Sequence, residues 1–291
     1  MPPLEPFLYA GVASTLLIAL GWRPWRAGSA PRSGPLASAL LPGCVFWLAW
    51  LPLHGGTPIP WPPIEGMHWV FWAVLLGAAP AIARALRAAP VPGVAPRGSG
   101  WRAASSLDLL AAQLLAWGAL RPLIQNRWSG GRTALWVVGV SCLVLVSSGA
   151  LRAAVVRRGE GPQLAGLLLA ALVGTALVLA QSSGTSAILT GALCTAVGGL
   201  WVLGLWRRTS TPLAGAEAPL ALTLVGLLLC GHIFASTPAA SALLLLLVPH
   251  LIWIPGRGVR PAGMRLVLAA GLVALAWWLA VPEPSPYDAY Y

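Results

Sequence analysis

A glutamate and a histidine three residues apart are the first candidates for chemistry in this sequence. The stretch PWPPIEGMHWVFW, residues 60–72, places Glu65 and His68 at the start of an apolar run. On a helix this spacing puts both side chains on one face, and carboxylate-bridged metal sites use the same ExxH spacing. Those sites need a second such pair from another helix, and the chain has only seven acidic residues. We therefore expect neither a metal nor another cofactor here.

The second interpretation of Glu65 and His68 is that they mark the entry of a helix into a membrane. Pro62 and Pro63 suit a first helical turn, because a proline there loses no hydrogen bond. A carboxylate in that turn complements the helix dipole. His68 falls one turn later, flanked by Trp69 and Trp72, at the level expected for lipid headgroups. We favour this interpretation over a ligand role.

Further polar residues are expected at the same face of the membrane. Arg121 precedes Pro122 near the end of an apolar run. Its side chain could extend outward to water, or it could pair with Glu65, the one acidic residue in a connection on that face. The pairing would create a polar vestibule suited to a small anion or a polar headgroup. The candidate residues of this vestibule are Glu65, His68, Arg121, Gln125, Gln181, Ser183 and His232.

Two other polar residues lie within or beside apolar runs. Asp108 ends the sequence SSLD, which has the form of a capping box opening a helix, and we favour a cap over a proton relay. His250 follows Pro249, which frees a backbone carbonyl one turn back, so the histidine is expected to hydrogen-bond locally. The alternative for His250 is proton coupling, for which the sequence offers no acidic partner nearby.

Catalytic motifs and cysteine pairs are absent from the sequence. The chain contains no GxSxG, HExxH or phosphate-binding GxxxxGK[ST] pattern and no lysine. Together with the scarcity of acids, this argues against an enzyme, and we assign no catalytic residue. The four cysteines, Cys44, Cys142, Cys194 and Cys230, lie in apolar stretches without a CxxC pair. They are expected to be small buried hydrophobic residues.

The composition places all these residues in a membrane protein. Apolar residues make up 58% of the 291 positions and charged residues only 9%, and a soluble domain needs more charge to cover its surface. A membrane span takes about 20 apolar residues. The runs that approach this length are Leu4–Trp22, Leu36–Leu53, Met67–Leu86, Leu107–Ile124, Thr133–Val156, Gln163–Gln181, Ser186–Trp206, Pro219–Phe234, Ala239–Ile254 and Met264–Val281. We predict an all-α polytopic transmembrane bundle of about ten helices, forming a single domain over residues 1–291.

The arginines predict how the chain crosses the membrane. Fifteen of the 18 lie in alternate connections, which the positive-inside rule assigns to the cytoplasmic face. Both termini are then outside. Arg121, Arg127 and Arg132 break the pattern on the outer face. Because the arginines stand in short clusters between apolar runs, the net charge of +11 indicates lipid headgroups rather than nucleic acid.

Small residues recur at every fourth position in the sixth and seventh runs. One stripe is Gly166, Ala170 and Gly174, and the other is Gly191, Thr195 and Gly199. Such stripes let helix backbones approach closely in lipid. The short polar connection QSSGTS predicts a tight hairpin between the two helices.

Three classes of function remain open. Ten helices in fewer than 300 residues resembles the format of the drug/metabolite carriers, which are built from two inverted five-helix halves. The resemblance implies a small-molecule permease, with a polar, solvent-connected cavity between the halves. Those carriers place both termini inside, which the arginine pattern here contradicts. The alternatives are a non-catalytic membrane subunit or scaffold, and a lipid-active enzyme acting near Glu65, His68 and Arg121.

The composition also indicates in which organism class and membrane the protein resides. The absence of lysine and the abundance of Ala, Leu, Gly and Pro are typical of a GC-rich bacterial genome. We therefore expect the protein in a bacterial cytoplasmic (inner) membrane. The expected partners are the lipid bilayer and other membrane chains, including further copies of this one.

Overall fold

The computed structural model describes residues 4–23, 33–86, 99–155, 161–206, 212–256 and 259–282, except for the side chains of residues 84–86, 99–105 and 259. These residues form helices and turns, with no strand among them, so the all-α prediction is confirmed. The helices are α1 (Glu5–Trp22), α2 (Gly34–Leu53), α3 (Gly66–Leu86), α4 (Ser99–Asn126), α5 (Gly130–Ala153), α6 (Gly161–Leu179), α7 (Gly184–Trp206), α8 (Glu217–Phe234), α9 (Ala239–Leu247), the 3₁₀ helix η2 (Val248–Trp253) and α10 (Val259–Ala280).

The predicted helix count holds, with one short member. Within the described ranges, nine helices are long and apolar enough to cross a membrane, and the segment Ala239–Trp253 is the shorter tenth. At Val248 this segment changes from α to 3₁₀ geometry, which rises about 2.0 Å per residue instead of 1.5 Å. The change lengthens the 15 residues to about 25 Å, close to the hydrocarbon thickness of about 30 Å.

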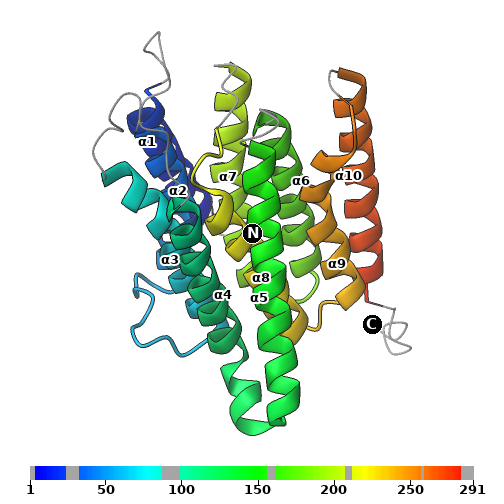
Figure 1. Ribbon diagram of the computed structural model, residues 1–291. Helices are drawn as coiled ribbons and strands as arrows, with labels where there is room; N and C mark the ends of the chain where they lie inside the picture. Colours follow the sequence, from blue (N-terminus) through cyan, green and yellow to red (C-terminus); the bar gives the residue numbers. More distant parts are fainter. Residues whose placement is uncertain are drawn as a thin grey trace.

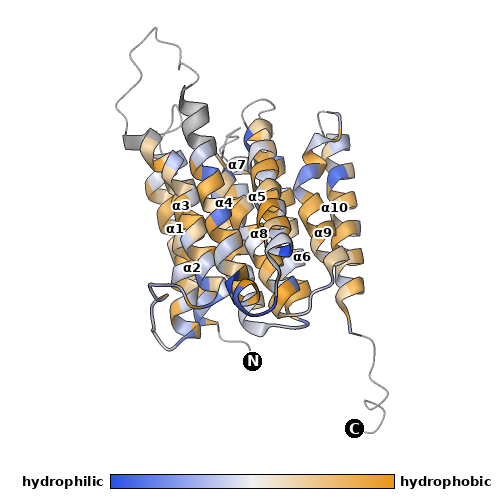
Figure 2. Ribbon diagram, turned by 60° about the horizontal axis from the view of Figure 1, so that its bottom comes forward, coloured by the Kyte–Doolittle hydropathy of each residue, from blue (hydrophilic) through white to orange (hydrophobic). Residues whose placement is uncertain are grey.

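The helices run antiparallel in one bundle, with α1 to α4 toward one edge and α9 and α10 at the other (Figure 1). In the apolar stretch of α8, 83% of the residues are buried inside the bundle, whereas in that of α10 only 17% are buried. The helix α8 is therefore central and α10 is peripheral. Figure 2 shows hydrophobic helix surfaces with hydrophilic residues gathered toward the two ends. Because an apolar outer surface suits lipid rather than water, the bundle is that of a multi-pass membrane protein.

The bundle has two ends, which we name by their connections. The loop end carries four described connections, residues 54–65, 127–129, 180–183 and 235–238. The arginine end is the opposite one, and most of its connecting residues lie outside the described ranges. The start of α1 and the end of α10 both lie at the loop end (Figure 2).

Small residues bring the helices together inside the chain. In the α7 stripe, a Cβ built on Gly191 would meet the ring of Phe7 at 2.9 Å, and one built on Gly199 would meet Ile18 at 2.6 Å, so α7 packs closely on α1. A Cβ built on Gly174 of α6 would likewise meet the side chains of Leu245 and Val273, so α6 packs closely on α9 and α10 at this position. The α6–α7 hairpin is formed as predicted, and both stripes contact helices of this chain.

The packing departs from two equivalent five-helix halves. Such halves would give α5 and α10 the same surroundings within each half. In the described part of the chain, α10 packs on α6, α9 and η2, whereas α5 packs on α4 and α8 rather than on α1. The resemblance to the drug/metabolite carriers therefore extends to the number of helices and not to this arrangement.

Candidate functional site

His68 completes the start of α3 with its side chain. The helix begins at Gly66, so Glu65 is the residue before it, and the Glu65 carbonyl accepts the His68 N–H at 3.1 Å. In return, His68 Nδ1 accepts the backbone N–H groups of Ile64 and Glu65 at 3.3 and 3.2 Å. This is the reciprocal half of a capping box, with histidine in the place of glutamate or glutamine. Because Nδ1 accepts, the ring hydrogen is assigned to Nε2.

The entry of α3 differs from the prediction in the residue at which the helix begins. Pro62 and Pro63 precede the helix instead of forming its first turn, because α3 starts three residues later, at Gly66. His68 is buried between the helices, with 3% exposure. Its ring meets the edge of Trp50, on which His54 stacks at 3.5 Å between ring centroids. Burial follows from this aromatic packing between the ends of α2 and α3.

The predicted vestibule residues occupy four separate places at the loop end. Glu65 is exposed before α3 and lies 3.9 Å from His68 Nε2. Arg121 and Gln125 are exposed on the last turns of α4, and Gln181 is exposed in the α6–α7 turn. No described hydrogen bond or ion pair joins Glu65 to Arg121.

Ser183 of the predicted set caps α7. Its hydroxyl accepts the backbone N–H of Ser186 at 3.4 Å and donates to the Ser186 hydroxyl at 2.9 Å. An oxygen that accepts from the third residue of a helix is an N-cap. The polar tip of the hairpin therefore satisfies backbone groups that the start of a helix leaves open.

His232, the last predicted residue, lines a groove at the loop end between the α4–α5 turn and the end of α8. The groove has a volume of about 430 Å³. Its aromatic rings form a series: His232 stacks with Trp136 at 6.1 Å, and Trp136 stacks with Trp128 at 5.7 Å between centroids. The guanidinium of Arg132 lies 5.2 Å from the Trp128 ring. The lining residues are Leu123, Arg127, Trp128, Arg132, Trp136, His232 and Ile233.

Two of the arginines that break the topology pattern, Arg127 and Arg132, thus meet at this groove. The sequence signal for it was the cluster RWSGGR, residues 127–132, on the face that should carry few arginines. The sequence did not predict which helix packs beside this cluster, because His232 of α8 lies about a hundred residues further along the chain.

Asp108 forms a buried ion pair at the arginine end, which corrects the capping-box prediction. The helix α4 begins at Ser99, so Ser105–Asp108 lies within it and cannot open it. Arg152 of α5 donates to the Asp108 carboxylate at 2.8 Å, and the two residues are 1% and 7% exposed. The sequence does contain a signal for this pairing, namely the distance of each residue from the α4–α5 turn. Asp108 lies 19 residues before Arg127 and Arg152 lies 23 residues after Ser129, so an antiparallel hairpin brings them within about one helical turn.

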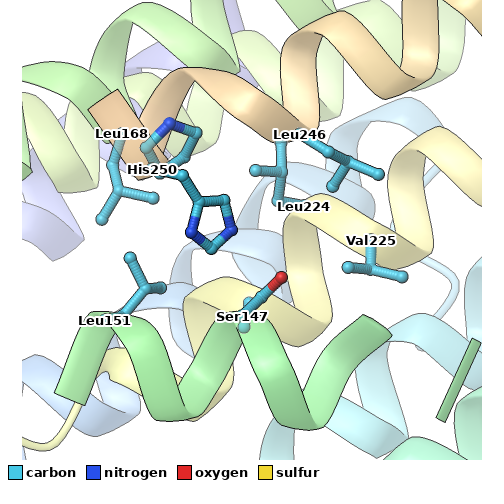
Figure 3. Close-up of a pocket in the computed structure, with 9 residues that line it drawn as sticks. Ser147, Leu151, Leu168, Leu224, Val225, Leu246 and His250 are labelled. Atoms are coloured by element: carbon cyan, nitrogen blue, oxygen red, sulfur yellow. The ribbon is translucent and has the colours of Figure 1, made fainter. Parts of the chain in front are cut away.

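Near Arg152, the interior of the bundle contains a small cavity. Its volume is about 10 Å³, the space of about one water molecule. Two polar side chains line it, His250 from η2 and Ser147 from α5, and Figure 3 shows the imidazole directed toward α5. The remaining lining residues are Leu151, Leu168, Ala221, Leu224, Val225, Leu246 and Pro249.

Both polar groups of this cavity lack a hydrogen-bond partner among the described residues. The Ser147 hydroxyl is buried without one. His250 does not form the local bond expected from its place after Pro249, because Pro249 is itself part of the 3₁₀ helix and His250 turns into the cavity. A buried polar group without a partner is costly, and this applies to Ser147, whereas His250 is half-buried. The cavity is therefore a candidate for an interior functional site.

Arg265 of α10 holds the end of η2 in place. Its guanidinium is 1% exposed and donates to the carbonyls of Ile254 and Gly256 at 2.7 and 2.9 Å. A further bond runs to the side chain of Gln163 at the start of α6. The short ninth segment is thereby tied by polar contacts to α10 and α6.

The cysteines differ in part from the prediction. Cys230 is buried, but Cys142 is exposed on α5, where its side chain faces the surface that lipid would cover. The described part of the chain contains no group of three or more histidine, cysteine, aspartate or glutamate side chains placed to hold a metal ion. No protein-family model matches the chain, and no curated protein sequence matches it.

Proposed function

We propose that the protein is a small-molecule carrier in which the cavity between Ser147 and His250 is part of the passage. The observation that carries the proposal is a membrane segment that changes from α to 3₁₀ geometry, with a histidine and a serine lining a small space between the helices. In many carriers the substrate site is formed by discontinuous helices. Polar side chains within membrane helices usually mark pathways for substrates, ions or protons.

The surroundings of the cavity support this role. Leu151 lines it, and the next residue, Arg152, holds the buried ion pair with Asp108. A buried ion pair contributes little net stability, so stability alone does not explain why the pair stands in this position. A carrier must also open and close, and a helix held by a few polar contacts, such as those of Arg265, can move between two positions.

The alternatives receive less support. A scaffold would bury its small-residue stripes against another chain, but Gly174, Gly191 and Gly199 contact helices of this chain. A lipid-active enzyme would need an acid, base or nucleophile at headgroup depth. The region named for that role does not form one pocket among the described residues, because Glu65 and Arg121 are both exposed and no described hydrogen bond or ion pair joins them.

We further propose that the carrier resides in a bacterial cytoplasmic membrane, with the loop end and both termini outside. The arginine distribution supports this orientation, because fifteen of the 18 arginines then lie on the cytoplasmic face. The partners proposed are the surrounding lipid and other membrane chains, including further copies of this one.

Water access to Ser147 tests the carrier proposal. In a variant with its four native cysteines replaced by serine or alanine, Ser147→Cys is introduced and treated in membrane vesicles with a charged methanethiosulfonate reagent. The cysteine thiolate, which forms in water and not in lipid, attacks the reagent, forms a mixed disulfide and releases methanesulfinate. A carrier that opens exposes this position to water part of the time, so labelling is expected from at least one side of the membrane.

The neighbouring residue supplies the matched control. Val146 is 65% exposed on the outer surface of α5, so Val146→Cys faces lipid and should remain unlabelled. Equal, negligible labelling of the two variants from both sides would show that the cavity never opens. That result would overturn the carrier proposal and leave a static membrane subunit.

A further inference from the structure

We propose that the groove formed by Leu123, Arg127, Trp128, Arg132, Trp136, His232 and Ile233 binds the anionic headgroup of a membrane lipid. This inference does not depend on the carrier proposal, because the groove lies at the loop end of the bundle and the cavity of His250 toward the arginine end. It gives a binding role to Arg127 and Arg132, whose position on the outer face the predicted topology does not explain.

The charge of the groove is positive and uncompensated within the described residues. Neither Arg127 nor Arg132 makes an ion pair there, and no carboxylate lines the groove. Arg132 is also the third residue of α5, whose start is capped by Ser129. The positive end of a helix dipole disfavours a cation in its first turn. A bound anion would offset both the repulsion between the two arginines and this dipole effect.

The aromatic side chains hold one arginine in position. The guanidinium of Arg132 lies over the ring of Trp128, which stacks on Trp136, which in turn stacks on His232. His232 Nδ1 lies 2.8 Å from the Thr237 carbonyl, which only accepts, so Nδ1 carries the hydrogen. The series therefore connects the α4–α5 turn to α8. Because an arginine fixed in advance loses less conformational entropy on binding, the groove is preorganised for a phosphate or carboxylate.

The shape and position of the groove favour a lipid over a free anion. A volume of about 430 Å³ lies in the range of small-ligand sites. Leu123 and Ile233 provide aliphatic walls, and tryptophans near the end of a membrane span are typical of the headgroup layer. A basic pocket between transmembrane helices at that depth is suited to an anionic headgroup with its acyl chains along the bundle.

Lipid selectivity tests the proposal. The full chain is purified in mild detergent with equal amounts of phosphatidylglycerol and phosphatidylcholine, and bound lipid is counted by native mass spectrometry. We expect selective retention of phosphatidylglycerol. Each of Arg127→Gln and Arg132→Gln should weaken this selectivity about fivefold, and the double variant about 25-fold, since an arginine near the surface contributes a factor of this size toward an anionic lipid.

Arg121→Gln is the matched control. It removes the same charge at the same end of the bundle from a residue that is exposed and does not line the groove. An equal effect of this control would mean general charge attraction and would overturn the proposal, as would retention without selectivity. In a further arm, inorganic phosphate replaces the anionic lipid. Binding of phosphate alone, with the same dependence on Arg127 and Arg132, would overturn the lipid assignment in favour of a soluble anion.

Discussion

Asp108 and Arg152 place opposite charges in an apolar layer, where each depends on the other. Removing water from a charge costs several kcal/mol, and the attraction between two buried charges offsets this cost only while both are present. The geometry here is favourable, with a 2.8 Å charge-assisted hydrogen bond between helices adjacent in sequence. The pair therefore ties the α4–α5 hairpin at the end opposite to its turn.

A double-mutant cycle on this pair has a defined outcome. Asp108→Asn and Arg152→Gln should each lower the free energy of unfolding by about 3 kcal/mol, because each removes the ion-pair partner of a buried charge. The double variant should lose clearly less than the sum of the two. Denaturation midpoints in detergent, followed by tryptophan fluorescence, measure the effect, and exposed Arg121→Gln serves as the control. Additive losses would mean that the two side chains act independently.

Sequence patterns describe single residues well only where the partner is local. The start of α3 was predicted near Glu65 and His68 because a helix entry is set by neighbouring residues, and the structure adds the reciprocal hydrogen bonds of His68. For Asp108 the local pattern SSLD was misleading, since the partner lies on the next helix. His232 was predicted at the loop end, but its stacking on Trp136 depends on the packing of α8 against α5.

At the scale of the helices, hydrophobicity and length were sufficient for prediction. The ten predicted runs correspond in order to the ten segments of the structure, with differences of a few residues at most ends and a larger one at the start of α4. The ninth run looked short, and its change to 3₁₀ geometry could not be predicted from hydrophobicity. Where the stripes of small residues would dock was also beyond the sequence, because several helices could have received them.

Gly118 offers a test of how closely two helices must approach. The indole ring of Trp69 on α3 lies directly against Gly118 of α4, and an added Cβ would overlap the ring. Gly118→Ala should lower the free energy of unfolding by about 1–2 kcal/mol, because displacing the ring costs more than the gain of up to about 1 kcal/mol in helix propensity. The midpoint of thermal unfolding in detergent provides the measurement.

The control for this prediction is another helical glycine. Gly139 of α5 has nothing within 4 Å of a Cβ built on it, so Gly139→Ala should leave stability unchanged or raise it slightly. If Gly118→Ala behaved like Gly139→Ala, α3 and α4 would have freedom to separate. The close contact would then not be needed for folding.

For the whole molecule, the arginine distribution predicts the orientation in the membrane, and the groove contains two of the three arginines that do not fit it. Moving one charge across a membrane potential involves about 2.3 kcal/mol per 100 mV, and fifteen of 18 arginines share one end of the predicted topology. Three arginines at the other end oppose the general trend, and two of these line the groove. A binding role for that groove would explain why these arginines stand against the prevailing pattern.

Reporter fusions test this orientation. In a bacterial host, alkaline phosphatase fused after Tyr291 should be active, and green fluorescent protein fused there should be dark. An even number of spans places both termini on the same side, and the arginine distribution predicts that this side is outside. Fused after Thr209, in the connection between α7 and α8, the two reporters should behave in the opposite way. A fluorescent fusion after Tyr291 would reverse the orientation and place Arg127 and Arg132 at the cytoplasmic face. Lipid selectivity at the groove could survive that result, but the positive-inside rule would then fail for the fifteen remaining arginines.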